Sequence, residues 1–297
     1  MSNLKTILKP KDLFRPLEYF KPDSVEETVK LLDKYGDKGQ IIAGGTDLMV
    51  DKDPKIKAII DITGLDLNYI KPDGNGVKIG ATTTFAEIAT DRSLNKSPYN
   101  SLSEAARAIG TPQIRNVATI GGNICHASPS ADSAPPLLAL DATVNIVGPA
   151  GERSLDIADF FLGVGENALK KDEMLTEIRL PAFPARTGSA FMKKGRLAAC
   201  DLAIVNVTVR LTMSDDSICQ EARIALGAVA PVPLRAKAAE AMLRGEKLQD
   251  KIISNAATQV VQLIKPISDI RSSAEYRKIL SCVLVERALK EAATKLS

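Results

Sequence analysis

The chain has 297 residues, of which 45% are hydrophobic and 25% are charged, a composition typical of a globular protein rather than a collagen-like or disordered one. At about 100–200 residues per domain, this length predicts two or three domains. Lys and Arg total 39 against 36 Asp and Glu, so the net charge is only +3. This balance disfavours a nucleic-acid-binding protein, which would carry a clustered basic stripe.

No apolar run reaches the roughly 18 residues of a membrane span, so the sequence predicts no transmembrane segment. The segment 1–15 is basic but lacks the apolar stretch of a signal peptide, which favours a cytoplasmic protein. The four cysteines lie far apart, at Cys125, Cys200, Cys219 and Cys282. Because no pair has C-x-x-C spacing, we expect mostly buried free thiols and no local zinc or iron–sulfur site.

The first part of the chain predicts a small α/β unit. A helix is expected over 25–35, because Ser24 and Glu27 have the spacing of a capping box and apolar residues then recur with helical period. Gly36 is a plausible end for this helix. Short apolar strands are expected at 40–43 and 58–62.

The middle of the chain predicts further strands and helices. Alternation over 77–81 favours a strand, Thr84 and Glu87 favour a helix start, and 102–109 is a helical pattern that ends at Gly110. Strands are also expected at 117–120, 142–147 and 175–180.

The composition changes at the proline-containing segment 181–187, a candidate boundary. Beyond it we expect strands at 202–211 and 222–228, followed by helices at 235–244, 251–264 and 274–295. The last third of the chain therefore predicts a small sheet with a group of helices.

Two segments, Ile41–Leu48 and Thr119–Asn123, run from apolar residues into Gly-Gly and then into small polar residues. Glycine allows a positive φ and a close approach of a ligand, and successive backbone N–H groups can form a concave nest for phosphate oxygens. Two such loops could hold one pyrophosphate from two sides, with further hydrogen bonds from the side chains of Thr46, Asp47, Thr119 and Asn123. Ordinary hairpin turns are the alternative.

Other catalytic and phosphate-binding motifs are missing from the sequence. There is no G-x-G-x-x-G after a strand, no G-x-x-x-x-G-K-[ST], no H-E-x-x-H and no G-x-S-x-G. The single histidine, His126, follows Cys125 directly, and neighbouring side chains usually diverge. We therefore expect a loop or partner-facing histidine rather than half of a catalytic pair.

Asp132 lies in a segment flanked by Pro129 and Pro135, shortly after the second glycine pair. A carboxylate at this place could bind the hydroxyl groups of a ribose or ribityl chain. A helix N-cap aspartate is an equally good interpretation from the sequence alone.

Three segments together resemble the FAD-binding medium subunits of the molybdenum hydroxylases, the group that contains the flavin subunits of xanthine, carbon monoxide, nicotinate and 4-hydroxybenzoyl-CoA oxidoreductases. The segments are Ala43–Leu48, Gln113–Asn123 and the Ser-Pro-x-x-Asp motif that ends at Asp132. The likeness extends from about Phe14 to the C-terminus. Each glycine pair alone is a weak signal, whereas the combination is specific.

The resemblance implies an α+β chain. An FAD-binding domain of the vanillyl-alcohol-oxidase (PCMH) type, built from two α/β subdomains, would be followed by a C-terminal domain with an antiparallel sheet and three helices. The implied division is an N-terminal extension at 1–13, an FAD-binding domain at 14–185 with subdomains at 14–65 and 66–185, and a CO-dehydrogenase-flavoprotein-like domain at 186–297.

The resemblance also implies which residues contact FAD. The two glycine segments would contact the pyrophosphate and its neighbouring groups, and Asp132 the sugar-alcohol or adenosine side. Leu175 would lie by the isoalloxazine ring, Lys193 or its neighbour Lys194 would reach the cofactor, and the chain would pass near the flavin at Gly110. The implied cofactor-binding residues are Ile41, Ile42, Ala43, Gly44, Gly45, Thr46, Asp47, Leu48, Gly110, Thr119, Ile120, Gly121, Gly122, Asn123, Asp132, Leu175 and Lys193.

Two differences from related flavoproteins bear on how FAD is attached and on which member of the family this chain resembles. Relatives with covalent flavin carry a histidine in the first glycine loop, where this chain has Thr46, so we expect noncovalent FAD. The 4-hydroxybenzoyl-CoA reductase type has an inserted cysteine-rich loop for a [4Fe–4S] cluster, and this sequence has no such insertion.

The resemblance implies an electron-transfer subunit without catalytic acid–base residues or metal ligands of its own. A large molybdopterin subunit would hydroxylate the substrate, a small subunit with two [2Fe–2S] clusters would relay electrons, and this chain would pass them to an acceptor such as NAD⁺. The three chains would form a heterotrimer or a dimer of heterotrimers. A stand-alone FAD oxidase or reductase of the same fold, and a non-flavin assembly subunit, are the alternatives.

Overall fold

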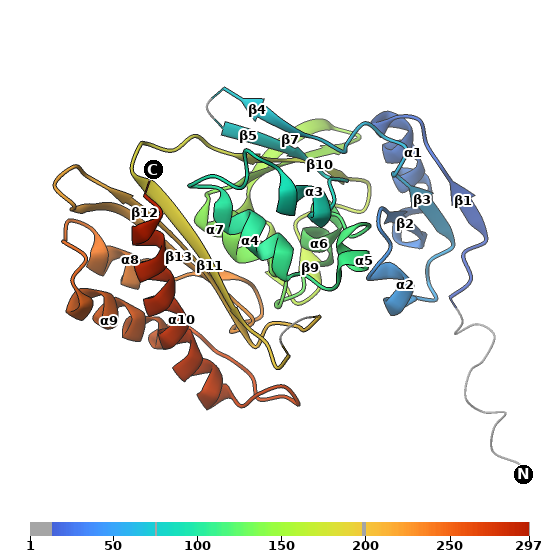
Figure 1. Cartoon of the computed structure of the whole chain (residues 1–297). Coiled ribbons are helices and arrows are strands. Elements are labelled where there is room, and N and C mark those ends of the chain that lie inside the picture. The colour runs from blue at the N-terminus through green and yellow to red at the C-terminus, as the bar shows by residue number, and fades with distance from the viewer. Residues whose placement is uncertain (1–13, 75, 198–199, 297) are drawn as a thin grey trace, which may run out of the picture.

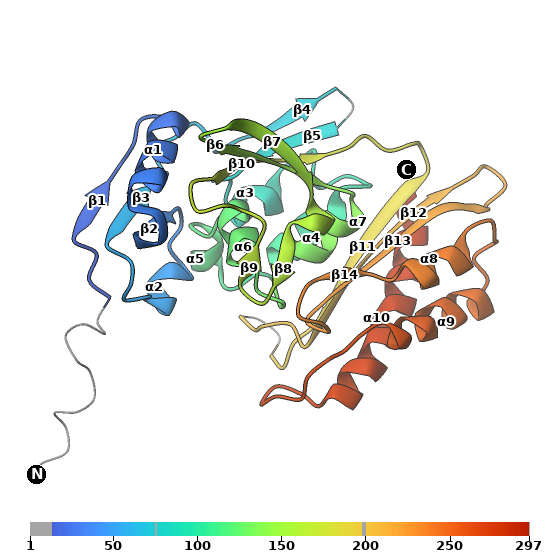
Figure 2. The same cartoon turned by 180° about the vertical axis from the view of Figure 1, so that it is seen from behind.

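The computed structural model describes residues 14–74, 76–197 and 200–296 (Figure 1). Three sheets of three to five strands follow one another along the described chain, and each has its own cluster of buried apolar side chains. Figures 1 and 2 show the five-stranded sheet and its helices between the N-terminal sheet and the C-terminal sheet. The expected α+β architecture is confirmed, whereas the exact domain boundaries and the cytoplasmic location stay predictions.

The N-terminal unit is a three-stranded parallel sheet in the order β1–β3–β2. Helix α1 (Val25–Tyr35) begins where the Ser24 side chain accepts a hydrogen bond from the Glu27 amide, and it ends at Gly36 with a φ of 49°. Both ends were predicted, because capping is encoded by nearby residues. The other elements of the unit are β1 (Glu18–Phe20), a 3-10 turn (Gly36–Lys38), β2 (Gly39–Ile42), α2 (Leu48–Asp51) and β3 (Ala58–Asp61).

The middle unit is a five-stranded antiparallel sheet in the order β4–β5–β10–β6–β7. Its strands are β4 (Ile70–Asp73), β5 (Gly76–Gly80), β6 (Thr143–Gly148), β7 (Gly151–Asp156) and β10 (Met174–Leu180). A 3-10 turn (Ile157–Asp159) and a small ribbon of β8 (Phe161–Gly163) and β9 (Glu166–Asn167) precede β10.

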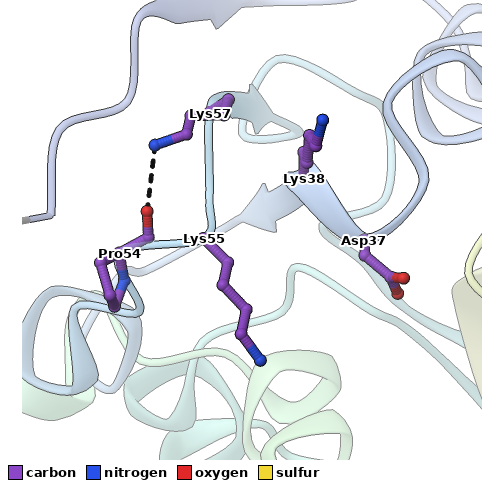
Figure 3. Close-up of a pocket in the computed structure, with 5 residues that line it drawn as sticks. All are labelled: Asp37, Lys38, Pro54, Lys55 and Lys57. Carbon is purple, nitrogen blue, oxygen red and sulfur yellow. Dashed lines mark hydrogen bonds between the residues drawn. The ribbon is translucent and has the colours of Figure 1, made fainter. Parts of the chain in front are cut away.

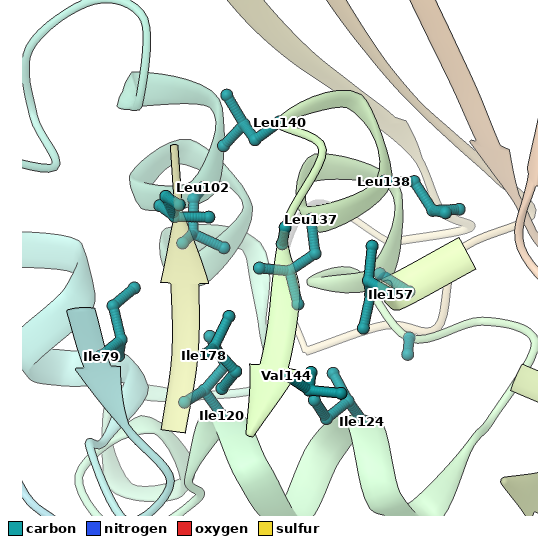
Figure 4. Close-up of a cluster of buried hydrophobic side chains, with 14 of the residues drawn as sticks. Ile79, Leu102, Ile120, Ile124, Leu137, Leu138, Leu140, Val144, Ile157 and Ile178 are labelled. Carbon is teal, nitrogen blue, oxygen red and sulfur yellow. The ribbon is translucent and has the colours of Figure 1, made fainter. Parts of the chain in front are cut away.

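Five short helices belong to this middle unit: α3 (Phe85–Thr90), α4 (Asn100–Ala108), α5 (Pro112–Arg115), α6 (Ile120–His126) and α7 (Ala134–Ala139). Side chains from α4, α6 and α7 meet those of β5, β6 and β10 in one apolar core (Figure 4). This core fixes the position of α6, which carries the second glycine pair.

One predicted strand in this unit is wrong. The segment 117–120 forms only an isolated bridge between Thr119 and Thr84, and Ile120 begins helix α6. Thr119 is the N-cap, and its side chain accepts a hydrogen bond from the amide of Gly122. The run of β-branched residues favoured a strand, but the helix cap and its tertiary contacts decide the structure.

The C-terminal unit is a four-stranded antiparallel sheet in the order β11–β12–β13–β14. Its elements are β11 (Thr187–Lys194), β12 (Val205–Met213), β13 (Cys219–Gly227), β14 (Leu234–Arg235), α8 (Lys237–Leu243), α9 (Asp250–Gln259), a 3-10 turn (Val260–Gln262) and α10 (Ala274–Thr294). The expected three helices are present, whereas β11 was not predicted as a strand.

Strand β12 is buried along its whole length, because both faces of the sheet are covered. Helix α10 packs against β11 and β12, while α4 and α7 of the middle unit contact the same sheet. Figures 1 and 2 show this sheet between the middle unit and the C-terminal helices. The seam between α7 and β12 is therefore an internal interface.

The four cysteines are free thiols in different environments. Cys219 is buried, Cys125 and Cys282 are half-buried, and Cys200 is exposed, so the expectation of mostly buried thiols is wrong for Cys200. Burial raises the pKa of Cys125 to about 12 and that of Cys219 to about 11. In the described part of the chain, no helix has the length and apolar character of a membrane span.

Candidate cofactor site

The first glycine loop joins β2 to α2. The strand ends at Ile42, Gly45 has a φ of 67°, and Leu48 begins the helix. Among the described residues, no acceptor takes the backbone N–H groups of Gly45, Thr46 or Asp47. Three successive amides are thus free to donate hydrogen bonds, which is the donor set of an anion-binding nest.

The first glycine loop packs through Gly44 against Val117, two residues before the second glycine segment. A Cβ atom on Gly44 would lie only 1.8 Å from the carbonyl oxygen of Val117 and 2.6 Å from its carbonyl carbon. Only glycine permits this close backbone approach. The predicted proximity of the two segments is therefore built into the packing of the N-terminal and middle units.

The second glycine pair has a different structure from the first. The amides of Ile120 and Gly121 donate to the carbonyl oxygens of Thr83 (3.0 Å) and Ala81 (2.9 Å), and Gly122 and Asn123 donate to Thr119. The four N–H groups at the start of α6 are thus already hydrogen-bonded within the chain. The prediction of a second open nest is wrong.

The two glycines of this pair also differ from each other. Gly121 is buried, and a Cβ there would lie 2.6 Å from the carbonyl oxygen of Ala81. Gly122 is exposed, and a Cβ there would meet only the Thr119 hydroxyl oxygen, at 3.0 Å. Gly121 therefore serves packing, whereas Gly122 leaves open space above the backbone.

A buried ion pair joins the middle and C-terminal units. The Lys193 ammonium lies 2.6 Å from Asp132 Oδ2 and also donates to the carbonyl oxygen of Ala108 at 3.0 Å. The Lys193 and Asp132 side chains are only 12% and 7% exposed. Burial raises the pKa of Asp132 above its ordinary value, while Lys193 and the Asn206 amide oppose this rise by stabilising the carboxylate.

This pair distinguishes Lys193 from Lys194, although which lysine reaches FAD stays a prediction, and it shows what Asp132 contacts. Lys193 is the partner of Asp132, whereas Lys194 is exposed. Asp132 is not a helix N-cap, because Ser133 occupies that position before α7. The carboxylate is instead directed toward the C-terminal sheet.

Hydrogen bonds connect the ion pair to the glycine segments. Ser133 Oγ donates to Asn123 Oδ1 of α6 at 2.6 Å. Arg115 Nη1 donates to the carbonyl oxygens of Ile109 (2.9 Å) and Gly110 (3.3 Å), and Gly110 has a φ of 46°. The end of α4, the start of α6 and the Asp132–Lys193 pair therefore form one connected site.

Comparison with known proteins identifies the family of this chain. A family profile described as the FAD binding domain in molybdopterin dehydrogenase matches residues 14–183, and one described as the CO dehydrogenase flavoprotein C-terminal domain matches residues 189–292. The chain belongs to the FAD-binding medium subunits of the molybdenum hydroxylases. The resemblance inferred from the glycine segments is confirmed.

Curated relatives match over nearly the whole chain. The nicotinate dehydrogenase FAD-subunit of Eubacterium barkeri is 34% identical over 272 residues, which cover 89% of this chain and 92% of that protein. The carbon monoxide dehydrogenase medium chain of Hydrogenophaga pseudoflava is 33% identical over 283 residues, with coverage of 93% and 96%. Both relatives are oxidoreductase subunits by name.

The fold matches as well. A solved structure of carbon monoxide dehydrogenase from Hydrogenophaga pseudoflava gives a TM-score of 0.91 at 34% identity, covering 95% of this chain and 99% of that one. Quinoline 2-oxidoreductase from Pseudomonas putida 86 gives a TM-score of 0.86 at 28% identity, with coverage of 95% and 98%. The predicted pairing of an FAD-binding domain with a flavoprotein C-terminal domain is confirmed.

The remaining predicted contact residues of this FAD-binding subunit lie close to the glycine segments or under them. Ile41 and Ala43 pack partly against the N-terminal core, and Ile120 is fully buried in the middle core. Leu175, on β10, is only 4% exposed and belongs to the same middle core. Their contacts with FAD, like those of the other predicted site residues, stay predictions.

His126 is the last residue of α6 rather than a loop residue, so that part of the prediction is wrong. Its Nδ1 lies 3.6 Å from Asp51 Oδ2 of α2, so α6, which contains the second glycine pair, contacts the helix that follows the first pair. Within the described ranges, no group of three or more His, Cys, Asp or Glu side chains could hold a metal ion.

A surface hollow of about 330 Å³ lies at the opposite end of the N-terminal sheet (Figure 3). It is lined by Asp37, Lys38, Pro54, Lys55 and Lys57. These residues precede or begin β2 and β3, whereas the first glycine loop follows the end of β2. The hollow is therefore separate from the candidate cofactor site.

Sequence reasoning missed three residues that support the site. The Val117 carbonyl group packs against Gly44, and Arg115 donates to the carbonyl groups at the end of α4. Asn206 donates to Asp132 Oδ1 at 2.8 Å. Asn206 could have been noticed, because it is the one amide side chain in an otherwise β-branched run, and a buried polar group needs a partner. The Gly44–Val117 contact depends on tertiary packing, whereas the Arg115 contacts are local and reach Ile109 and Gly110.

Proposed function

We propose that this chain takes electrons from the [2Fe–2S] clusters of a small partner subunit and passes them through noncovalent FAD to an external acceptor such as NAD⁺. The observation that carries the proposal is the loop of open amides at Gly45–Asp47, whose Gly44 packs against Val117 just before α6, together with the buried Asp132–Lys193 pair. An elongated cofactor with an anionic diphosphate and a polar chain requires such separated donor sets.

The residues present fit FAD. The unbonded amides of Gly45, Thr46 and Asp47 are donors for anionic phosphate oxygens, and the Gly44 approach to Val117 keeps this loop beside α6. Lys193 supplies a buried positive charge, and Asp132 balances it. Bound FAD would supply the redox chemistry, since a flavin exchanges electrons one or two at a time, while the chain binds and orients it.

The position of the single histidine supports noncovalent binding. His126 lies at the end of α6, and Thr46 occupies the loop position at which related covalent flavoproteins carry histidine. We expect the FAD to be released by denaturation. FAD that stays with the denatured chain would contradict this part of the proposal.

The proposed partners are a large molybdopterin-binding subunit and a small iron–sulfur subunit, in a heterotrimer or a dimer of heterotrimers. Support comes from the names of relatives, which include medium chains and the 6-hydroxypseudooxynicotine dehydrogenase complex subunit alpha of Paenarthrobacter nicotinovorans. The hydroxylated substrate would be bound by the large subunit.

The test is native purification of the tagged chain, followed by a visible absorption spectrum and identification of copurifying polypeptides. Flavin bands with iron–sulfur absorption, two further polypeptides and NAD⁺ reduction would support the electron-relay function. A flavin spectrum from a single active chain would favour a stand-alone oxidase or reductase. A colourless chain that FAD cannot reconstitute would overturn both and leave an assembly subunit.

A further inference from the structure

We propose that Asn206 is a positioning residue of the cofactor site, which holds the Asp132 carboxylate in place from the C-terminal sheet. This inference rests on the proposed function, because Asp132 matters to FAD only if the chain binds FAD there. It adds a residue to the site that neither the glycine segments nor the Asp132–Lys193 pair includes.

Asn206 and Lys193 hold the two oxygens of one carboxylate. They are direct partners in the β11–β12 register, and Asn206 pairs in turn with Gly227 of β13. Asn206 Nδ2 donates to Asp132 Oδ1 at 2.8 Å, and Lys193 donates to Oδ2 at 2.6 Å. The direction of the carboxylate is therefore fixed by side chains from two adjacent strands.

This arrangement carries a local cost in stability. Asn206 is fully buried, and its Oδ1 has no hydrogen-bond partner among the described residues. A Cβ on Gly227 would lie 2.3 Å from that oxygen, so the neighbouring strand must carry glycine. A buried unpaired oxygen and a glycine in a strand both disfavour the folded state. Features that lower stability in this way are expected at functional sites.

The loop that carries Asp132 also contacts the second glycine segment. The next residue, Ser133, donates to Asn123 of α6, and the Ala228 amide donates to the carbonyl oxygen of Pro129 at 2.7 Å. Asn206 is thus one of the contacts that tie this loop to the C-terminal sheet. Together with Lys193, it is one of the two that act on the carboxylate itself.

Thr208 offers a matched control. It lies two positions along β12 on the same face, is fully buried, and its hydroxyl has no hydrogen-bond partner among the described residues. Thr208→Val therefore changes a buried polar side chain of the same strand without touching Asp132. A general effect of altering this strand would appear in both variants.

The first test compares Asn206→Leu, Thr208→Val and the unchanged full-length chain. The Kd for FAD is measured by flavin fluorescence, and the melting temperature is measured without FAD. We expect about tenfold weaker binding for Asn206→Leu, because a charge-assisted hydrogen bond is lost, and unchanged binding for Thr208→Val. Equal FAD affinity in all three chains would overturn the proposal.

A second variant keeps the shape of the side chain and guards against misfolding of Asn206→Leu. Asn206→Asp places a second carboxyl group beside Asp132. The charged groups that face this position are Asp132 and Lys193. Arg277 is the next charged group along the seam, where it donates to the carbonyl groups of Ile204 and Ala228. Two neighbouring carboxylates raise one pKa, so the pair binds a proton as the pH falls.

The protonated Asp at position 206 can donate to Asp132 as Asn206 does, whereas the ionised form repels it. The ratio of variant Kd to unchanged Kd should therefore be about tenfold or more at about pH 8 and fall toward one near about pH 5. A ratio that does not change with pH would show a merely structural residue and overturn the proposal. An unchanged chain that binds no FAD would overturn the proposed function itself, and this inference with it.

Discussion

The two glycine pairs have the same local sequence pattern but differ in the hydrogen bonding of their backbone amides. At the first pair, the loop leaves the amides of Gly45, Thr46 and Asp47 without acceptors in the described part of the chain. At the second, α6 begins immediately, and its first N–H groups are bonded to Thr83, Ala81 and Thr119. A glycine pair after an apolar run therefore does not by itself define a phosphate nest.

What the two pairs share is close backbone packing. Gly44 and Gly121 each lie so near a carbonyl oxygen, of Val117 and Ala81 respectively, that a Cβ atom would collide with it. Gly45 and Gly122 are the partners that have more freedom, one in a left-handed conformation and one exposed. Each pair thus combines one glycine for packing with one that shapes the surface offered to a ligand.

The largest expected effect is that of Gly44→Ala. The new methyl group would have to displace the Val117 carbonyl group, so the free energy of unfolding should fall by about 3–5 kcal/mol and FAD binding should be lost. Thermal unfolding and an FAD titration measure both. Gly74→Ala is the control, since its φ of 60° costs about 1 kcal/mol but nothing lies within 4 Å of the added atom.

Gly121→Ala should have the next largest effect. Its Cβ would lie 2.6 Å from the Ala81 carbonyl oxygen, which must shift together with the N-terminus of α6. We expect the free energy of unfolding to fall by about 1–3 kcal/mol, as measured by denaturant titration. A variant as stable as the unchanged chain would mean that α6 can move freely, contrary to its packing in the middle core.

Thr119→Val isolates the helix cap. The variant keeps the shape of the side chain but removes the acceptor for the Gly122 amide, so the free energy of unfolding should fall by about 1 kcal/mol. FAD affinity should stay within about twofold of the unchanged value, since the freed amide is also available to the ligand. A tenfold loss of affinity would instead indicate that the Thr119 hydroxyl itself contacts FAD.

The smallest expected effect on stability is that of Gly122→Ala. Alanine favours the helix by about 1 kcal/mol, and this gain is offset by the tight contact of the added atom with the Thr119 hydroxyl oxygen, at 3.0 Å. The melting temperature without FAD should therefore hardly change. Binding of FAD should weaken about tenfold if the ligand approaches this exposed backbone, and unchanged binding would remove the second glycine pair from the contact surface.

The sequence predicted those elements that depend on neighbouring residues, and it failed where contacts between distant residues decide the structure. Helix α1 was predicted from end to end, because Ser24, Glu27 and Gly36 act on the residues next to them. The segment 117–120 was assigned wrongly, because its β-branched residues favour a strand, and the Thr119 cap and the contacts with Thr83 and Ala81 override that preference.

The candidate site shows the same limit. The amides of Gly45–Asp47 lack acceptors among the described residues, whereas those of Ile120 and Gly121 donate to Thr83 and Ala81. This difference depends on residues far along the chain, so no local sequence pattern predicts it. The Asp132–Lys193 pair joins residues 61 positions apart, and only the family resemblance placed both at the cofactor. Asn206 was overlooked for the same reason, although its polar side chain in a buried strand was a usable signal.

The most direct test of the difference between the two glycine pairs is residue-resolved amide hydrogen exchange of the full-length chain, with and without FAD. Without FAD, the amides of Gly45, Thr46 and Asp47 should exchange fast, and those of Ile120–Asn123 more slowly. FAD should add much more protection to the first set than to the second. Protection gained only at Ile120–Asn123, or at neither segment, would contradict the assignment of the first loop as the phosphate-binding nest.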